Sequence, residues 1–200
     1  MNILLASNSP RRKELLQNLG FEFSVVSIDC EESFPPSLPS SEVAGFLSLL
    51  KSNAYLDLKQ DEILITADTV VELDQQILGK PETKEKAFEM LRSLSGKIHH
   101  VYTGITIRTC NQTITETDVA KVVFNDITDS EILHYIEKSQ PFDKAGSYGI
   151  QEWIGMAKIR KIEGSFYTIM GLPTHLVYEM LNRIRLAPLK FTIFTKKIKE

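Results

Sequence analysis

Two adjacent arginines, Arg11 and Arg12, stand where a helix is expected to begin. A short apolar run, a polar turn and a proline surround them, which predicts a strand near residues 2–6 and a helix near residues 10–19 with Ser9 as its cap. The first turn of a helix carries partial positive charge, so each cation there costs about 0.3–1 kcal/mol. This placement needs an explanation.

Two explanations remain open on the local sequence. In the first, the strand–turn–helix presents backbone N–H groups, Ser7, Ser9 and both arginines to a phosphate-bearing ligand, which arginine binds bidentately. In the second, the arginines are exposed to solvent and are tolerated at a small cost. Neither GxxxxGK[ST] nor GxGxxG follows the strand, so a P-loop or a dinucleotide-binding turn does not account for them.

Asp68 is the second unusual residue, because it interrupts the apolar segment "ILITADTVV". An ionised carboxylate is costly to bury without partners. Asp68 therefore either marks a bulge or strand end near water, or points into a cleft as a general base or metal ligand. We favour the cleft, because Lys80 follows within "GKP" and can bring a cation to the same end of the sheet.

Other polar residues are less informative when taken alone. Lys51 follows an apolar helix face and is typical of a surface lysine, and Glu32 lies in a proline-rich loop typical of solvated acids. The segment "DKAGSYGIQ" is a loop whose glycines permit close backbone approach. In that loop Gln151 could recognise the edge of a base, whereas we expect Trp153 to belong to the core.

The elements that must position these residues alternate between strand and helix patterns. Strands are expected at 2–6, 21–28, 62–73, 99–110, 112–125 and 156–164, with an edge strand in the tail 188–200. Helices are expected at 10–19, 41–58, 83–94, 128–139 and 173–184. Ser40 or Ser41 can cap the second of them, Asp129 or Ser130 lies near the cap of the fourth, and the second has Val43, Phe46, Leu47 and Leu50 on one apolar face. This order predicts an α/β fold.

Composition narrows the class of protein. The chain of 200 residues suits one domain, or two small lobes around a cleft, and its net charge of −3 argues against a broad nucleic-acid-binding surface.

Cys30 and Cys110 are far apart and outside any CxxC spacing, which favours a reducing cytoplasm. Adjacent His99 and His100 point to opposite faces of a strand and make a poor metal pair. The chain has neither a convincing signal peptide nor a membrane-spanning run, so we expect a cytoplasmic protein without membrane partners.

Taken together, the motifs resemble one family. "LASNSPRRKELL", "ADTVV" followed by "LGKP", "VYTGI", "DKAGSYGIQ" and "GLP" occur in the order seen in Maf proteins, the septum-formation-inhibitor-like nucleoside triphosphate pyrophosphatases, from about residue 3 to residue 184. The resemblance implies a two-lobed mixed sheet with flanking helices and a central cleft, similar to inosine-triphosphate pyrophosphatases, in a single domain over 1–200. It also implies a homodimer, a divalent cation (Mg²⁺ or Mn²⁺), and hydrolysis of a nucleoside triphosphate to the monophosphate and pyrophosphate.

The resemblance also assigns roles to matching positions. Asp68 would be the proton acceptor that activates water, and Glu32 would help it to hold the metal or the water. Gln151 would contribute from the opposite side of the cleft. The residues implied to contact the triphosphate are Ser7, Arg11, Arg12, Lys51 and Lys80, of which the two lysines also count as catalytic.

Within the family, Arg11, Thr69 and Gln151 are similar to the branch that acts on dTTP and UTP, with modified pyrimidine nucleotides as further candidates. The alternatives are a 7-methyl-GTP pyrophosphatase and a nucleotide-binding regulator of cell division without turnover; the intact set of Asp68 and two lysines favours an enzyme. One departure is Thr168, which replaces an asparagine often found before "GLP". The loop around Glu32 also matches only loosely.

Overall fold

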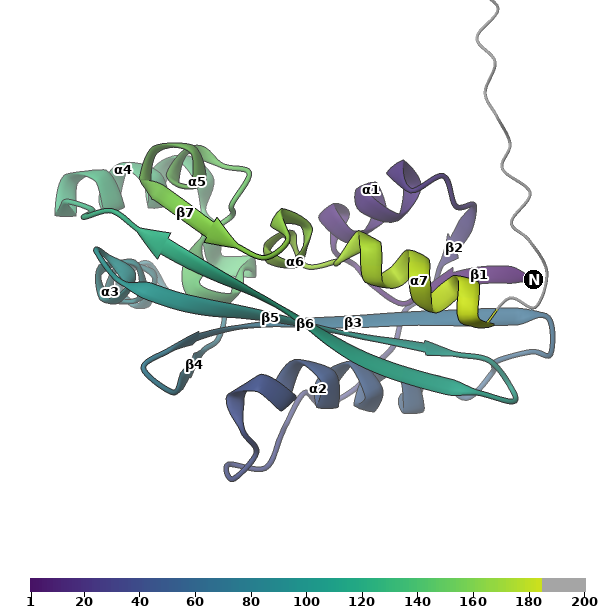
Figure 1. The fold of residues 1–200 in the computed structure, drawn as a ribbon. Coiled ribbons are helices and arrows are strands. Elements are labelled where there is room, and N and C mark those ends of the chain that lie inside the picture. Colours follow the sequence, from purple (N-terminus) through teal and green to yellow (C-terminus); the bar gives the residue numbers. More distant parts are fainter. Residues whose placement is uncertain (185–200) are drawn as a thin grey trace, which may run out of the picture.

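The computed structural model describes residues 1–184, and one mixed seven-stranded sheet runs through this part of the chain (Figure 1). Its strands are β1 (Asn2–Leu5), β2 (Phe23–Val25), β3 (Glu62–Leu73), β4 (Gln76–Leu78), β5 (Ile98–Arg108), β6 (Thr113–Phe124) and β7 (Ile159–Glu163). The helices are α1 (Pro10–Asn18), α2 (Ser40–Ala54), α3 (Lys84–Leu94), α4 (Asp129–Ser139), α5 (Trp153–Lys158), α6 (Phe166–Met170) and α7 (Thr174–Ile184), with short 3₁₀ turns η1 (Pro141–Asp143) and η2 (Ala145–Ser147). The predicted α/β fold is confirmed.

The strand order is β2-β1-β3-β5-β6-β7, with β4 beside β3. β1 is parallel to β2 and β3, whereas β3, β5, β6 and β7 pair antiparallel. The strands expected at 99–110 and 112–125 are β5 and β6, which pair as a hairpin. Parallel β1 feeds directly into α1, so the β1–α1 turn lies at the end of a buried strand, as the sequence predicted.

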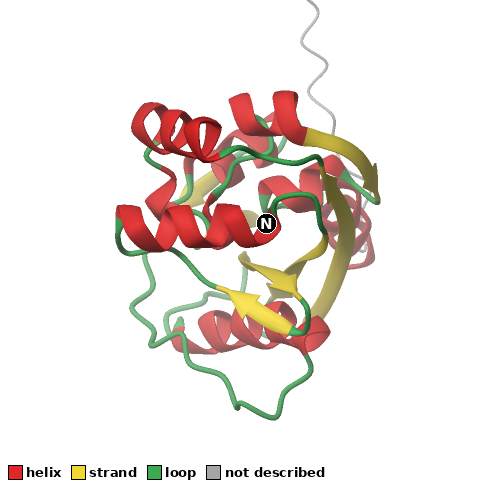
Figure 2. Cartoon of the chain, turned by 90° about the vertical axis from the view of Figure 1, so that its left-hand side faces the viewer, coloured by secondary structure: helices red, strands yellow, loops and turns green. Residues whose placement is uncertain are grey.

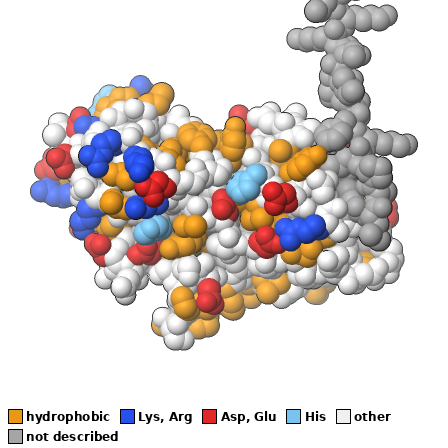
Figure 3. Space-filling model, viewed as in Figure 1, with side chains coloured by type: hydrophobic (Ala, Val, Ile, Leu, Met, Phe, Trp, Pro, Cys, Tyr) orange, Lys and Arg blue, Asp and Glu red, His pale blue; other side chains and the backbone are white. Residues whose placement is uncertain are grey.

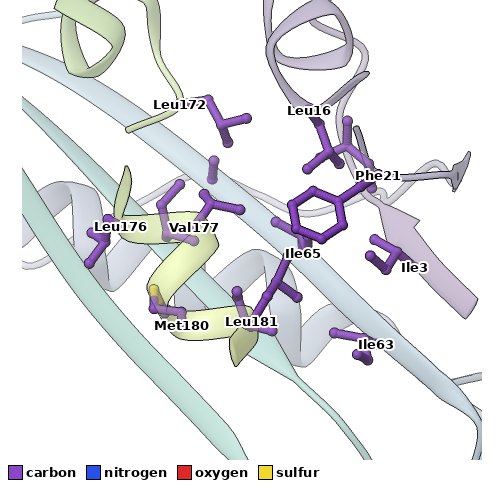
Figure 4. Packing of buried hydrophobic residues seen from close by; sticks show 14 of the residues in the cluster. Ile3, Leu16, Phe21, Ile63, Ile65, Leu172, Leu176, Val177, Met180 and Leu181 are labelled. Atoms are coloured by element: carbon purple, nitrogen blue, oxygen red, sulfur yellow. The ribbon is translucent and has the colours of Figure 1, made fainter. Parts of the chain in front are cut away.

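Two apolar cores lie on the same face of the sheet. One joins β1, β3 and β5 to α1 and α7, and Figure 4 shows Leu16 and Phe21 packed near Val177 and Leu181 in this core. The other joins the opposite ends of β3, β5 and β6 to α3, α4 and α5. The helix α2 covers the other face of the sheet, where Val43 packs with Val70, so helices lie on both sides of the strands (Figure 2).

A polar row separates these two cores. Thr103 of β5 lies directly opposite Thr69 of β3 on one side and Asp118 of β6 on the other. Side chains opposite one another in antiparallel strands share a face of the sheet. The helix α6 contacts β5 and β6 and lies over the middle of the sheet, between α1 and the α4–α5 pair (Figure 1).

Next to this row, β3 pairs with two different strands along one of its sides, first with β1 and further along with β4. β1 pairs with β3 only as far as Ile65, and β4 begins its pairing at Val71. Between them β3 pairs in regular register with β5, and Asp68 lies opposite Gly104. The alternative that Asp68 marks a bulge or a strand end is therefore wrong: it lies within a continuous strand at a gap between two neighbouring strands.

The helix α2 differs from its prediction at both ends. Its N-cap position is Pro39, without a side-chain cap bond, so neither Ser40 nor Ser41 is the cap. The helix ends at Ala54, because Tyr55 is extended and its carbonyl accepts a hydrogen bond from Arg108. Phe46, expected on the buried face, is 37% exposed, since small residues instead face the sheet.

The second half of the chain contains two short helices that the sequence pattern did not predict. The segment expected as a strand from residue 156 begins as α5 and becomes β7 only at Ile159. The helix α6 was not expected at all. The cap of α4 is Thr128, which forms a capping box with Glu131, and Asp129 and Ser130, expected near this cap, are the first two residues of the helix. The edge strand predicted in the tail lies outside the described residues.

Charged side chains of both signs are interspersed on the face seen in Figure 3. Cys30 and Cys110 are free thiols. Among residues 1–184, no helix combines the length and apolar character needed to span a membrane.

His99 provides a test of the second core. Its side chain is fully buried, and its Nε2 lies 2.8 Å from the Tyr148 hydroxyl. Burial lowers the pKa of His99 from 6.5 to about 3, with a smaller contribution from His100. In the unfolded chain His99 therefore becomes protonated below about pH 6.5, whereas in the folded chain it stays neutral until the pH falls to about 3.

We expect His99 to reduce the free energy of unfolding as pH falls through this window, by up to about 1.4 kcal/mol per pH unit. Urea denaturation between pH 7 and pH 5 measures the effect. His99→Gln should flatten the pH dependence, whereas His134→Gln, at an exposed histidine, should leave it unchanged. Equal slopes for the unmodified protein and His99→Gln would contradict the prediction.

Candidate active site

A cleft of about 1180 Å³ opens at the gap along β3. Its wall includes the β1–α1 turn, the loop after β2, Lys51 of α2, residues 67–71 of β3 and the β4–α3 connection. The loop from Phe142 to Gln151 and the end of α6 complete it. The cleft therefore collects residues that are distant in sequence, and it includes every site residue that the resemblance implied: Ser7, Arg11, Arg12, Glu32, Lys51, Asp68, Thr69, Lys80 and Gln151.

Asp68 and Lys51 form an ion pair in this cleft. Asp68 is only 7% exposed, and its Oδ1 lies 2.5 Å from Nζ of Lys51. The same Nζ lies 2.9 Å from Oε1 of Glu32, whose side chain is largely exposed. One ammonium group thus holds two carboxylates, which offsets the cost of burying Asp68. Lys51, taken alone a surface lysine, is half-buried and central to the site.

The two arginines have different surroundings. Nη1 of Arg11 lies 3.2 Å from Asp143 across the cleft. Burial alone would raise the pKa of Asp143, but its hydrogen bond and charge interaction with Lys144, together with Arg11, lower it below the ordinary value. Asp143 is therefore an anion at neutral pH, and it relieves part of the charge misfit at the start of α1.

Arg12 is held from two sides. Its Nε donates to the carbonyl of Gly171 at 2.8 Å, and its Nη2 donates to Oγ1 of Thr69 at 3.1 Å. Burial lowers the pKa of Arg12, while the charge of Asp68 opposes this and the charge of Arg11 adds to it. Within residues 1–184 the guanidinium uses two of its five N–H donors on the protein, so further donors can reach a ligand in the cleft.

The remaining predicted residues fall into two groups. Ser7 is 9% exposed, and its hydroxyl oxygen accepts the backbone N–H of Ser9 at 3.2 Å, so Ser9 occupies the cap position without its own side-chain bond. Lys80 and Gln151 are exposed side chains on the wall of the cleft. Trp153 packs against the second core, as expected.

Lys144 is a cleft residue whose importance the sequence did not reveal. It is 8% exposed and lies 2.7 Å from Asp143 and 3.2 Å from Glu152. Its neighbours on the chain gave the only signal, a glycine-containing loop with charged residues. Lys144 holds this loop in place by pairing with both acids.

The residues of the cleft fit a hard divalent cation. Asp68 and Glu32 already approach one positive charge together, and carboxylate oxygens are the ligands that such cations prefer. Among the described residues, no group of three or more His, Cys, Asp or Glu side chains could hold a metal by itself. Mg²⁺ is usually bound by one or two carboxylates together with substrate phosphates, so this pair suffices.

Five basic side chains line the cleft around a buried aspartate, and such an arrangement can bind phosphate groups and accept a proton. The chain belongs to the family described as Maf-like protein, which it matches over residues 2–184. The resemblance drawn from the motifs is therefore confirmed.

Curated relatives cover nearly the same length. A protein of Bacteroides thetaiotaomicron named dTTP/UTP pyrophosphatase is 48% identical over 91% of this chain and 95% of its own. Proteins with the same name from Flavobacterium johnsoniae and Porphyromonas gingivalis are 45% and 46% identical over 91% and 90% of this chain, and over 94% and 92% of their own. The solved structure of the Staphylococcus aureus Ham1 protein is similar in fold, with a TM-score of 0.55 and 15% identity over 92% of this chain and all of that one.

Proposed function

We propose that this chain is a dTTP/UTP pyrophosphatase, a hydrolase that cleaves the bond between the α- and β-phosphates of these nucleotides. The observation that carries the proposal is the Asp68–Lys51 pair in a cation-lined cleft, in a chain that shares 48% identity with a relative of that name. The products are the nucleoside monophosphate and pyrophosphate.

The basic residues bind and orient the triphosphate. Arg11, Arg12, Lys51 and Lys80 line the cleft, and their charges offset the negative charge that grows on the phosphate oxygens in the transition state. Ser7 adds a hydroxyl at the β1–α1 turn, where backbone N–H groups also face an anion. The two arginines at the start of α1 are thus placed for the substrate. In the protein without substrate, Arg11 pairs with Asp143 and Arg12 donates to the carbonyl of Gly171.

Asp68 takes the proton from the attacking water. Lys51 fixes Oδ1 of this carboxylate, so the other oxygen of the carboxylate is the one that accepts the proton. No covalent intermediate is needed. Asp68 and Glu32 would hold a divalent cation, either Mg²⁺ or Mn²⁺, which when bound polarises water and phosphate oxygens.

Gln151 is proposed to select the base. It lies on the cleft wall, and an amide recognises a base edge through paired donor and acceptor groups. We expect Gln151→Ala to lower kcat/KM for UTP relative to that for 7-methyl-GTP by about tenfold, the cost of one or two lost hydrogen bonds. Parallel assays of both nucleotides check this, with Gln112→Ala, on the β5–β6 turn, as the control. Unchanged selectivity would refute the role.

The experiment for the activity is pyrophosphate release by the purified protein with Mg²⁺ or Mn²⁺. The substrates are dTTP, UTP, CTP, dGTP and 7-methyl-GTP. Preference for dTTP and UTP supports the proposal. Release from 7-methyl-GTP alone would keep the chemistry and replace the substrate, whereas nucleotide binding without release from any of them would favour the regulator.

Further properties expected of the family also belong to this proposal. We expect a homodimer, a cytoplasmic location, and one two-lobed domain over residues 1–200. Support for the last comes from the single sheet that both cores share. Light scattering of the purified protein tests the dimer directly.

A further inference from the structure

The polar row between the two cores leads to Arg12. The hydroxyl of Thr103 donates to the carbonyl of Thr168 at 2.7 Å, and the hydroxyl oxygens of Thr69 and Thr103 are 2.9 Å apart. The same hydroxyl oxygen of Thr69 also accepts a hydrogen bond from Nη2 of Arg12. Thr103 and Thr168 are both fully buried, so these bonds are shielded from solvent.

Counting protons fixes the direction of each bond. A threonine hydroxyl has one proton. Thr103 uses its proton on the carbonyl of Thr168, so Thr69 must donate to Thr103. The oxygen of Thr69 accepts from Arg12. The hydroxyl proton of Thr69 therefore points into the sheet, and is not directed at a ligand in the cleft.

The hydrogen bond from Nε of Arg12 to Gly171 also leads to the polar row, through α6. The helix α6 is attached to the row twice, because Thr168 accepts from Thr103 through its carbonyl and donates to Asp118 through its hydroxyl. Its C-cap is Gly171, whose carbonyl accepts Nε of Arg12. At a φ of +103°, Gly171 has no side chain to crowd Thr69, whose Oγ1 lies 3.2 Å from the position that a Cβ would take.

We propose that Thr103, Thr168 and α6 form a positioning network that fixes the guanidinium of Arg12 for the triphosphate. Thr69, expected from the resemblance to help select the substrate, acts by holding Arg12 and not by contacting the base. Thr103 is the central positioning residue, since it links Thr69 to α6. The inference rests on the proposed function for the identity of the ligand.

The test compares Thr103→Val with Thr106→Val. Both remove a buried hydroxyl from β5, but the hydroxyl of Thr106 bonds to Ser48 of α2 and to Thr115 of β6. Binding of the α,β-methylene analogue of UTP is measured by calorimetry, with kcat and KM for UTP beside it. We expect Thr103→Val to weaken analogue binding by about tenfold, as for one displaced charged hydrogen bond, and Thr106→Val to change it less than about twofold. Thr103→Ser keeps the hydroxyl and should restore binding. Thermal denaturation checks that the variants are folded.

A double-mutant cycle shows whether the effect passes through Arg12. In an Arg12→Lys background, which lacks the planar fork, Thr103→Val should cause little further loss. Full additivity of the two substitutions, or equal dissociation constants for Thr103→Val and Thr106→Val, would overturn the inference. Because analogue binding needs no turnover, an unmodified protein that binds but releases no pyrophosphate contradicts the proposed function alone.

Discussion

Asp68→Asn is expected to lower kcat for pyrophosphate release from UTP by about 10²–10⁴-fold, the range typical of removing a general base. Asparagine has the same shape and can still accept a hydrogen bond from Lys51, but it cannot take a proton from water. Binding of the nucleotide should change much less, because the arginines and Lys80 remain. Pyrophosphate release in the presence of Mg²⁺ and calorimetric binding of the α,β-methylene analogue of UTP measure the two effects separately.

The matched control for this change is Asp74→Asn. Asp74 has a largely exposed side chain that pairs with Lys97 at the β3–β4 turn, so the same substitution there should leave kcat unchanged. Thermal denaturation shows whether Asp68→Asn is folded, since Lys51 then loses one of the two acidic partners that it has within residues 1–184. A folded Asp68→Asn protein with full turnover would remove Asp68 from the mechanism.

Arg12→Ala is the second change with a large expected effect. A charge-assisted hydrogen bond contributes about 1.5–3 kcal/mol, so loss of a guanidinium fork on the triphosphate should reduce kcat/KM for UTP by about 10²–10³-fold. The structure supports this because two protein acceptors, Gly171 and Thr69, fix the geometry of Arg12. Steady-state kinetics with UTP give the value.

Arg92→Ala is the control, because Arg92 is an exposed arginine of α3 paired with Asp129. It removes the same side chain from a surface ion pair, where the contribution to stability is about 0–1 kcal/mol. Its kcat/KM should match that of the unmodified protein. Arg12→Ala with unchanged kcat/KM would show that the triphosphate lies elsewhere in the cleft.

The sequence predicted the strands and helices whose patterns are long and regular. β3, β5 and β6 each have 11 or 12 residues, and α3 is capped by Thr83 and continues with helical apolar spacing. The helices α5 and α6 have only 6 and 5 residues. Helices of this length are not stable by propensity and depend on tertiary contacts. In α6 those contacts are the bonds of Thr168, which no local pattern contains.

The sequence predicted which residues line the cleft better than it predicted the hydrogen bonds that they form. The motifs brought Asp68, Lys51 and Lys80 into one cleft, as the structure shows. The sequence could not show that Arg12 already has protein partners, because Gly171 lies 159 residues away. The role of Thr103 had one available signal, a threonine opposite Thr69 in an apolar strand, but this signal requires the register of the sheet.

The continuity of the sheet has a consequence for how the cleft works. β3, β5 and β6 pass from one apolar core to the other without a break, so the two halves are not joined by a flexible loop. Closing the cleft by rotation would require bending three hydrogen-bonded strands together. We therefore expect Arg12 and Lys51, which have protein partners, to lie close to their working positions before the nucleotide arrives. Binding then spends little free energy on rearranging the protein, and most of the attraction remains for orienting the bond to be broken.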